Sequence, residues 1–174
     1  SGEYKGLFNM LQRIDLRTVN KRTLESLAKG GAFDSFENEH RAVYFDKNGD
    51  DRTFLEKAMK FANSVKEAEE SSQVSLFGEA SDVQIPEPPI PQVEEWPRII
   101  ALKAEKEVNG MYLSSHPLDE YKLELKNYTN AGLGIFQDLE QISGKKFMVA
   151  VIVSDIRSGV SKRGDEFGFI SFED

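Results

Sequence analysis

The side chains that could carry out catalysis are few in this chain of 174 residues. It has no cysteine and two histidines, so a thiolate or zinc site is not expected. There is no Ser–His–Asp order, no glycine-rich phosphate loop and no isolated group of carboxylates typical of an active site. His116, which precedes Pro117, is expected to cap or pack rather than to act as a catalyst. The sequence therefore predicts no catalytic residue, metal site or cofactor within this chain.

The stretch DKNGDDRTFLEK resembles a calcium-binding loop at its start. Asp46, Asn48 and Asp50 stand at the first, third and fifth ligand positions. The sixth position requires glycine but holds Asp51, and the twelfth requires a bidentate glutamate but holds Lys57. We therefore expect a turn here rather than a cation site.

Three residues in the stretch VNKRTLESL have the chemistry of a phosphate site. Asn20 is a good helix N-cap, and Lys21 and Arg22 place two cations in the first turn, where they oppose the helix dipole. Such cations beside the free backbone N–H groups of a helix start suit a phosphate. We therefore predict DNA-backbone contact at Asn20, Lys21 and Arg22; the alternative is that the side chains are simply solvated.

A second basic pair lies in the polar stretch SGVSKRGD between two apolar runs. Lys162 and Arg163 are expected at the tip of a β-hairpin, beside Phe167 and Phe169 of the second strand. A hairpin of this kind in an oligonucleotide-binding barrel holds single strands against its aromatic side chains. An ordinary solvated hairpin explains the same residues equally well.

The stretch QVSLF has the chemistry of a short peptide that binds a partner. Leu76 and Phe77 stand side by side in a segment with no local means of burying them, with Gln73 and Ser75 just upstream. Burying both apolar side chains in a partner's pockets could contribute about 3–6 kcal/mol before ordering costs. Docking on this chain's own helices is the alternative, and the residues alone favour it.

The elements expected to position these residues fall into four segments, and the fold class is mainly α with a β-hairpin. From Glu67 to Glu95 the chain has eight acidic residues and no Lys or Arg, and without this stretch its charge would be close to neutral. Five prolines between 86 and 97 favour an extended, loosely packed or disordered backbone there. The predicted segments are a helical region over 1–70, a linker over 71–97, a helical connector over 98–143 and the start of a β domain over 144–174.

Within the first segment, apolar side chains recur at helical spacing. A helix beginning after Asn20 is expected to end at Gly30 and Gly31. Its apolar face holds Leu24, Leu27 and Ala28, and a later helix carries a stripe of Phe54, Leu55, Ala58, Ala62 and Val65. Phe33, Phe36 and, after the linker, Trp96 are expected to pack.

The connector predicts two helices and the last segment two strands. The first helix begins at PRIIALK and is expected to end near Ser114, and Ser115 or His116 caps the second. The runs KKFMVAVIVSDI and EFGFISFED are expected strands. Two strands alone are marginal in water, so they suggest the beginning of a longer antiparallel unit.

The order of the motifs resembles a known family. EKEVNGMYLSSHPLDEY resembles a signature segment of the bacterial replicative DNA polymerase III alpha subunit. IDLRTVNKRTLESLAKGGAFDSF is similar to that family's helix-hairpin-helix region, although the Gly-x-Gly hairpin of a phosphate-gripping motif is absent. VAVIVSDIRSGVSKRGDEFGFISFED is similar to the start of its oligonucleotide-binding (OB) barrel, and QVSLFG falls where the family carries an internal sliding-clamp motif. The resemblance covers essentially the whole chain.

The resemblance implies a part of a DNA-directed DNA polymerase, a cytoplasmic nucleotidyltransferase, that lies outside its catalytic palm. The metal-bound aspartates and their Mg²⁺ would lie outside this chain, which would itself be inactive. Gln73, Ser75, Leu76 and Phe77 match the clamp motif, and Asn20, Lys21 and Arg22 lie in the DNA-binding region. The implied partners are the sliding clamp (beta subunit), primer–template duplex DNA, single-stranded template DNA and other polymerase III holoenzyme subunits, with no membrane.

Two other functions fit the same residues. The chain could be a structural scaffold whose helices pack against other polymerase domains, or an independent nucleic-acid-binding module. A net charge of −8 argues against tight binding of nucleic acid by the chain as a whole.

Overall fold

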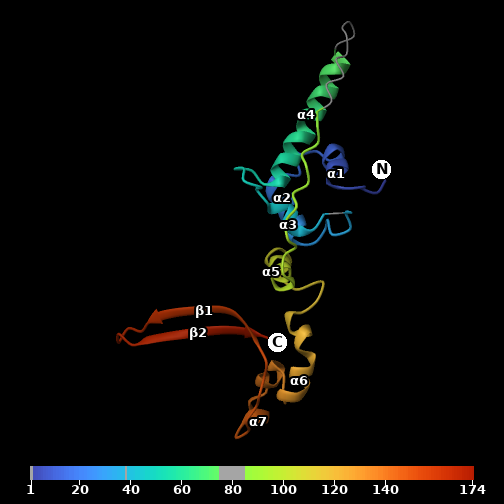
Figure 1. Cartoon of the computed structure of the whole chain (residues 1–174). Helices are drawn as coiled ribbons and strands as arrows, with labels where there is room; N and C mark the ends of the chain where they lie inside the picture. Colours follow the sequence, from blue (N-terminus) through green and yellow to red (C-terminus); the bar gives the residue numbers. More distant parts are fainter. Residues whose placement is uncertain (1, 38, 75–84) are drawn as a thin grey trace. The chain divides into compact units, whose positions relative to one another are not determined.

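The chain forms two units, which are described separately (Figure 1). The computed structural model describes residues 2–37, 39–74 and 85–174. The first unit spans Ser1–Ser114 and the second Ser115–Asp174. The helices of the first unit are α1 (Leu7–Arg13), α2 (Lys21–Lys29), α3 (Arg41–Phe45), α4 (Phe54–Val74) and α5 (Arg98–Asn109). The second unit holds η1 (Pro117–Tyr121), α6 (Lys122–Tyr128), η2 (Leu133–Gln137), α7 (Leu139–Ile142), β1 (Ile152–Val160) and β2 (Glu166–Glu173).

Helix α2 begins and ends where the sequence predicts. The side-chain oxygen of Asn20 accepts a hydrogen bond from the backbone N–H of Thr23 at 3.1 Å, which satisfies one donor of the first turn. The helix ends at Gly30, whose N–H donates to Ser26 O at 2.9 Å. Leu24 and Ala28 are fully buried, but Leu27 remains 40% exposed, so the buried face of α2 is narrower than the sequence predicts.

The core of the first unit lies between α1, α2, α3 and α4. The predicted anchors Phe33 and Phe36 are buried with their rings stacked at 5.6 Å, and Phe33 also meets the ring of Tyr44 at 5.4 Å. The buried side chains that contact one another here are Leu7, Met10, Leu11, Leu24, Ala28, Phe33, Phe36, Val43, Tyr44, Phe54, Leu55, Ala58 and Ala62. The α4 stripe is therefore confirmed at Phe54, Leu55, Ala58 and Ala62, with Val65 half-buried.

The extended segment 85–97 packs on the helices, in contrast to the loose linker that its composition suggests. It runs back along α4 (Figure 1). Pro91 is buried, Val93 packs on the core and accepts a hydrogen bond from His40 Nε2 at 3.1 Å, and Trp96 stacks on Phe45 at 5.3 Å. These apolar side chains recur along an extended backbone, so a proline-rich strand gains contacts that a composition average does not reveal. Its predecessor α4 continues to Val74, since no proline or glycine interrupts it before that residue.

A buried carboxylate, unexpected from the sequence, fixes the loop after α5. Glu105 is fully buried and accepts hydrogen bonds from the backbone N–H groups of Leu113 and Ser114 and from Ser114 Oγ at 2.7 Å. Arg41 Nη1 lies 3.5 Å from the same carboxylate, and Arg41 Nη2 lies 2.6 Å from Asp34. Burial raises the pKa of Glu105, but the hydrogen bonds from Ser114 and Leu113 and the charge of Arg41 outweigh it and leave that pKa lowered.

Helix α5 ends earlier than the sequence predicts. Its last residue is Asn109, and Gly110 follows in the left-handed conformation with φ 78°, which glycine adopts without strain. The residues up to Ser114, predicted as helix, instead form the loop that Glu105 holds.

The second unit begins with a capped turn that matches its prediction. The His116 ring nitrogen Nδ1 accepts from the backbone N–H of Leu118, and the carboxylate of Asp119 accepts from the N–H of His116 at 2.8 Å. Pro117 stands in the first turn and is buried. Further along, Asn130 and Met148 exchange two hydrogen bonds, of 3.0 and 2.8 Å, which tie the helical part to the chain before β1.

Strands β1 and β2 form an antiparallel pair with a bulge between Val153 and Asp155. The predicted hairpin is confirmed, but β1 begins at Ile152 rather than near Lys145 and extends to Val160, so the turn is shorter than expected. The difference follows from pairing, because β2 offers partners to residues 152–160 and not to the apolar residues before them. None of the helices in the described part of the chain is both long and apolar enough to cross a bilayer.

Candidate nucleic-acid interface

The start of α2 presents one exposed cation and one that is paired. Arg22 is exposed, and no ion pair involves it among the described residues. Lys21 donates to Glu56 at 2.9 Å and lies 3.6 Å from Glu25. The side chain of Asn20 is occupied by the N–H of Thr23. Of the three residues predicted to meet phosphate here, Arg22 is thus the one whose charge is available.

The partner of Lys21 is itself held in place at the start of α4. Glu56 accepts from the backbone N–H of Thr53 at 2.8 Å and from Thr53 Oγ1 at 3.1 Å, and Glu56 N–H donates to Thr53 Oγ1. This is a capping box, with Thr53 before the first turn. The N–H of Thr53, followed by Lys21, lowers the pKa of Glu56 to about 2, and the hydrogen bond to Glu56 raises the pKa of Lys21.

The tip of the hairpin carries the second predicted pair. Lys162 and Arg163 are exposed in the turn between β1 and β2. Ser161 Oγ accepts from the backbone N–H groups of Arg163 and Asp165 at 3.2 and 3.1 Å, and Gly164 supplies φ 89°. Both cations therefore stand on a hydrogen-bonded turn at the tip of the hairpin that β1 and β2 form (Figure 1).

The two faces of the hairpin differ in chemistry. Strand register places Phe167 opposite Gly159 and Phe169 opposite Arg157, with the two phenyl rings edge-on at 5.4 Å. Phe167 lies over Gly159, where a Cβ would come within 2.9 Å of its ring, so the missing side chain makes room for the phenyl group. The other face holds aliphatic residues and Phe172. The first face thus carries the exposed rings of Phe167 and Phe169 beside Arg157, which lies 2.6 Å from Asp155. The apolar residues of the second face are Val153, Ile156, Val160, Ile170 and Phe172.

The predicted clamp motif lies at the end of α4. The backbone of Gln73 belongs to the last turn of this helix, while Ser75, Leu76 and Phe77 fall outside the described residues. The chain is described again from Ile85, which lines a hollow beside α4. The motif therefore follows directly on a helix whose first half is anchored in the core.

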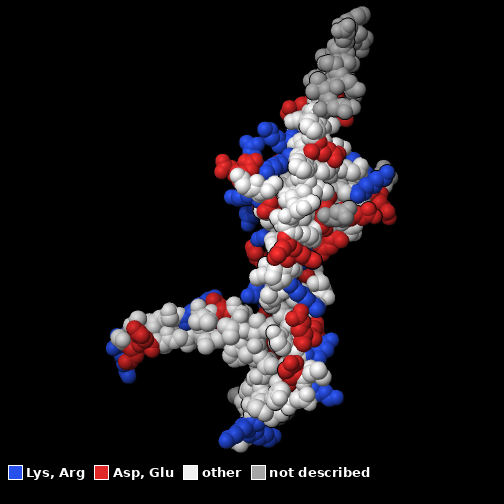
Figure 2. All heavy atoms as spheres, in the orientation of Figure 1, with Lys and Arg blue, Asp and Glu red and all other residues white. Residues whose placement is uncertain are grey.

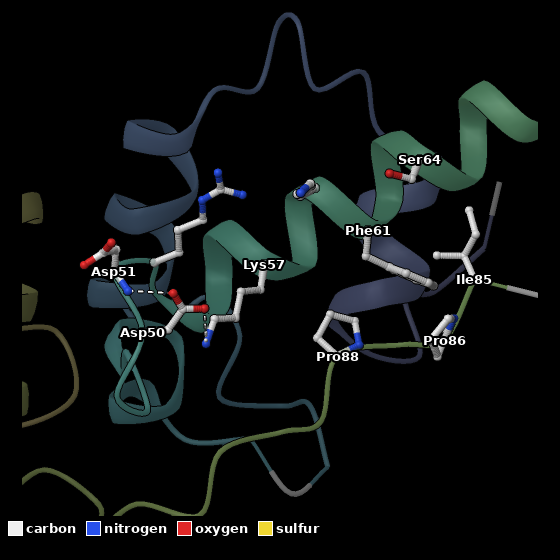
Figure 3. A pocket seen from close by; sticks show the side chains of 10 residues that line it. Asp50, Asp51, Lys57, Phe61, Ser64, Ile85, Pro86 and Pro88 are labelled. Atoms are coloured by element: carbon white, nitrogen blue, oxygen red, sulfur yellow. Dashed lines mark hydrogen bonds and ion pairs between the residues drawn. The ribbon is translucent and has the colours of Figure 1, made fainter.

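A basic groove on α4 escaped the sequence analysis. Its volume is about 550 Å³, and Arg52, Lys57 and Lys60 outnumber the carboxylates of Asp50 and Asp51 in its lining. Phe61 and Ile85 are among its apolar side chains (Figure 3). The signal that could have revealed it is the spacing of Lys57 and Lys60, which puts both on neighbouring positions of one helix face. Figure 2 shows basic side chains gathered on the side of this unit where α4 begins.

These surfaces share the chemistry of polyanion binding. Exposed guanidinium and ammonium groups contact phosphates, and exposed phenyl rings stack on bases. No three His, Asp or Glu side chains of the described residues come together as metal ligands.

Comparison with known proteins matches both the first helices and the whole chain. A family model described as "Helix-hairpin-helix motif" matches residues 1–43. A DNA polymerase III subunit alpha of Vibrio cholerae is 34% identical over 174 residues, which is 99% of this chain and 14% of that protein. The subunits of the same name from Escherichia coli K12 and Treponema pallidum are 31% and 30% identical over 99% and 100% of this chain, again 14% of each. The resemblance found in the sequence is thereby confirmed, and the chain spans about a seventh of these relatives.

Proposed function

We propose that this chain is the clamp-binding and DNA-positioning part of a bacterial DNA polymerase III alpha subunit, because its whole length is homologous to one segment of such subunits. The helix-hairpin-helix match supports DNA as a partner, and the basic and aromatic surfaces supply groups that suit it. In this proposal the chain keeps the enzyme on its template, and template-directed nucleotidyl transfer takes place elsewhere in the parent polymerase. The expected partners are the sliding clamp, primer–template DNA and other subunits of the replicative holoenzyme.

The proposed tether is the stretch from Gln73 to Phe77. Two adjacent large apolar side chains bind in pockets of the clamp, and Gln73 forms a hydrogen bond at their rim. Binding of this kind alone is of about micromolar strength, but a chain that also holds DNA raises the effective concentration of the second contact. Modest individual affinities would then suffice for a polymerase that stays on DNA over many nucleotide additions.

The proposed DNA contacts are of two kinds. Around Asn20, Arg22 meets the backbone phosphate of the duplex, and Lys21 joins it only after giving up its contact with Glu56. On the hairpin, Lys162 and Arg163 meet phosphates of the single-stranded template while Phe167 and Phe169 stack on its bases. Neither kind of contact selects a sequence, which suits an enzyme that must copy every sequence.

The observation that carries the clamp proposal is the pairing of Leu76 with Phe77 at the position of the family's clamp motif. Titration of purified sliding clamp into the chain tests it, with Leu76→Ala plus Phe77→Ala as the variant. We expect affinity to fall about tenfold or more, as for central apolar anchors of an interface. The matched control is Ile99→Ala plus Ile100→Ala, an adjacent exposed apolar pair on α5, which should bind as the wild type does. Unchanged affinity in the first variant would remove the clamp-binding role.

A structural scaffold is the second candidate function, and one feature of the second unit favours it. Large apolar side chains there stay exposed, with Tyr121 at 54%, Leu123 at 74% and Tyr128 at 70%. Tyr121 and Tyr128 line a hollow of about 610 Å³ together with Phe147 and Met148. Such a surface suits packing against another domain of a large polymerase. If neither clamp nor DNA binds the chain, the scaffold is the remaining function.

A further inference from the structure

The groove beside α4 combines charged side chains, two of them cations without an ion pair in the described residues, with apolar ones. Its cations are Arg52, Lys57 and Lys60. Figure 3 shows Lys57 with Asp50 and Asp51 toward one end of the groove, and Phe61, Ile85 and Pro86 toward the other. Phe61 is 7% exposed and forms its floor, since its ring packs into the helical unit against Phe8 at 5.4 Å. The groove therefore has a floor held in place by core packing, with charged side chains and apolar side chains around it.

The charges of this groove are not all balanced from within. Lys57 lies 3.3 Å from Asp50 and donates to Lys47 O at 3.2 Å, so its position is fixed. The N–H of Asp51, Lys57 and the charge of Arg52 lower the pKa of Asp50, which keeps this carboxylate ionised. Arg52 and Lys60 are exposed, and neither has an ion pair within the described parts of the chain. Asp50 and Asp51 also line the groove, so its three cations outnumber its two carboxylates, in a chain whose net charge is −8.

We propose that this groove binds the phosphodiester backbone of a nucleic-acid strand, with Arg52 and Lys60 on the phosphate oxygens and the Phe61–Ile85–Pro86 wall against the sugars. A strand presents this combination of anionic oxygens and apolar sugar edges at every nucleotide. The inference rests on the proposed DNA-positioning function and adds a contact that the stretch around Asn20 does not supply. It adds two cations, one just before α4 and one on it, to Arg22, since Glu56 pairs with Lys21.

The test uses the whole chain and a fluorescent primer–template duplex, with binding followed by anisotropy over a series of salt concentrations. The variant is Arg52→Gln plus Lys60→Gln, which removes both charges and keeps a polar, unbranched side chain at each position. We expect affinity to fall about tenfold at low salt, and the slope of log affinity against log salt to flatten by about 2, one for each lost phosphate contact. The charge-preserving variant Arg52→Lys plus Lys60→Arg should retain the wild-type affinity and slope.

The matched control removes the same charge elsewhere. Lys103→Gln plus Lys126→Gln changes two exposed lysines on α5 and α6 and should leave affinity within about twofold of the wild type. An equal loss in the control would show a general charge effect and overturn the groove. Wild-type affinity in the groove variant would overturn it too, while leaving the DNA-positioning function intact. A wild-type chain that does not bind the duplex at low salt would overturn both.

Two further probes separate the strand from other anions. In one outcome, the groove variant loses affinity for a deoxynucleoside triphosphate but keeps its affinity for the duplex. That result would assign the groove to free nucleotides. A poly-glutamate peptide that behaves in this way would assign it to an acidic protein. Either outcome overturns the assignment to a nucleic-acid strand.

Discussion

Lys21 on α2 and Glu56 on α4 are joined by a contact of 2.9 Å between residues 35 positions apart in the sequence. The same carboxylate caps α4 through Thr53, so one side chain both begins a helix and neutralises a cation of its neighbour. A lysine that looks available for phosphate in the sequence is thus already paired in the folded chain. The exposed cations of this unit that carry no such partner include Arg22, Arg52 and Lys60.

Glu56→Gln should increase the affinity of the chain for duplex DNA. The substitution removes the nearer of the two carboxylates that hold Lys21 and leaves Glu25 at 3.6 Å, so the ammonium group becomes more available to phosphate. We expect a gain of about threefold at low salt that disappears at high salt, measured by anisotropy. Glu69→Gln is the control, because it removes one charge from an exposed position further along α4. Equal gains in the two variants would mean that lower overall charge, and not release of Lys21, explains the change.

The same residue predicts a pH dependence of stability. The pKa of Glu56 is lowered to about 2 in the folded chain, first by the N–H of Thr53 and then by Lys21, against an ordinary value of about 4.3. A lowered carboxyl pKa stabilises the folded state above the unfolded pKa, and this contribution is lost as pH falls from about 4.3 to about 2. Thermal unfolding over this range should therefore show a smaller decline of Tm for Glu56→Gln than for the wild type.

Asp15, Asp50 and Asp119 also have lowered pKa values, because each accepts a backbone N–H. They destabilise the wild type and the variant equally on acidification, so the difference between the two curves isolates Glu56. Parallel curves would contradict the prediction.

Glu105→Ala should be among the most destabilising substitutions in the first unit. It leaves Arg41 without its buried partner and removes the acceptor for two backbone N–H groups, a loss of about 3–5 kcal/mol. Urea unfolding measures the free energy, and hydrogen exchange should show the amides of Leu113 and Ser114 losing protection. The control Glu107→Ala, on the same helix, breaks an exposed ion pair with Lys29 and should cost about 1 kcal/mol or less. Similar costs at the two positions would contradict the assignment of Glu105 as the centre of this network.

Gly31→Ala should destabilise the chain through Arg41. Gly31 has φ 82°, and an added Cβ would lie 2.3 Å from Arg41 Nη2 and 2.8 Å from Asp34 Oδ2. Gly49→Ala is the control, since its φ is 74° but its Cβ would meet open space. The control should lose about 1–2 kcal/mol from backbone strain alone, and Gly31→Ala should lose clearly more in urea unfolding. Equal losses would show that the contact with Arg41 does not matter.

Phe169→Ala should weaken the binding of single-stranded DNA about 5- to 100-fold, corresponding to the loss of one stacked base. The ring is 66% exposed on the face that also carries Arg157. Phe172→Ala is the matched control, because Phe172 is 50% exposed on the opposite face of the same strand. Binding of a labelled oligothymidine to the two variants distinguishes the faces. A larger loss of affinity for Phe172→Ala would contradict binding of DNA on the face that carries Phe169.

The features that the sequence predicts well are local ones. The Asn20 cap, the cap at His116 and the hairpin turn at Lys162 and Arg163 each depend on a few neighbouring residues, and all three form. The sequence also predicts the resemblance to the polymerase family correctly, because the order of the motifs is more specific than any single motif.

The features that the sequence does not predict depend on residues distant in the chain. The contact of Lys21 with Glu56 and that of Arg41 with Glu105 require helices to have packed first. In the sequence, the groove cations resemble ordinary surface side chains. They line a groove only because the segment beginning at Ile85 lies beside them in the fold. The prediction that Leu27 is buried is wrong for a simpler reason. Leu27 follows Leu24 by three residues, and the rotation of the helix over that interval places it at the edge of the buried face.

Helix α4 also has a mechanical consequence. With 21 residues it is about 31 Å long, and its first half is embedded in the core while its last turns extend beyond it. A rigid rod of this length acts as a lever: a tilt of about 10° at its base would shift its far end by about 5 Å. Force applied to the end of α4 would therefore be transmitted to its base, where Thr53, Glu56 and the groove cations lie within a few residues of one another.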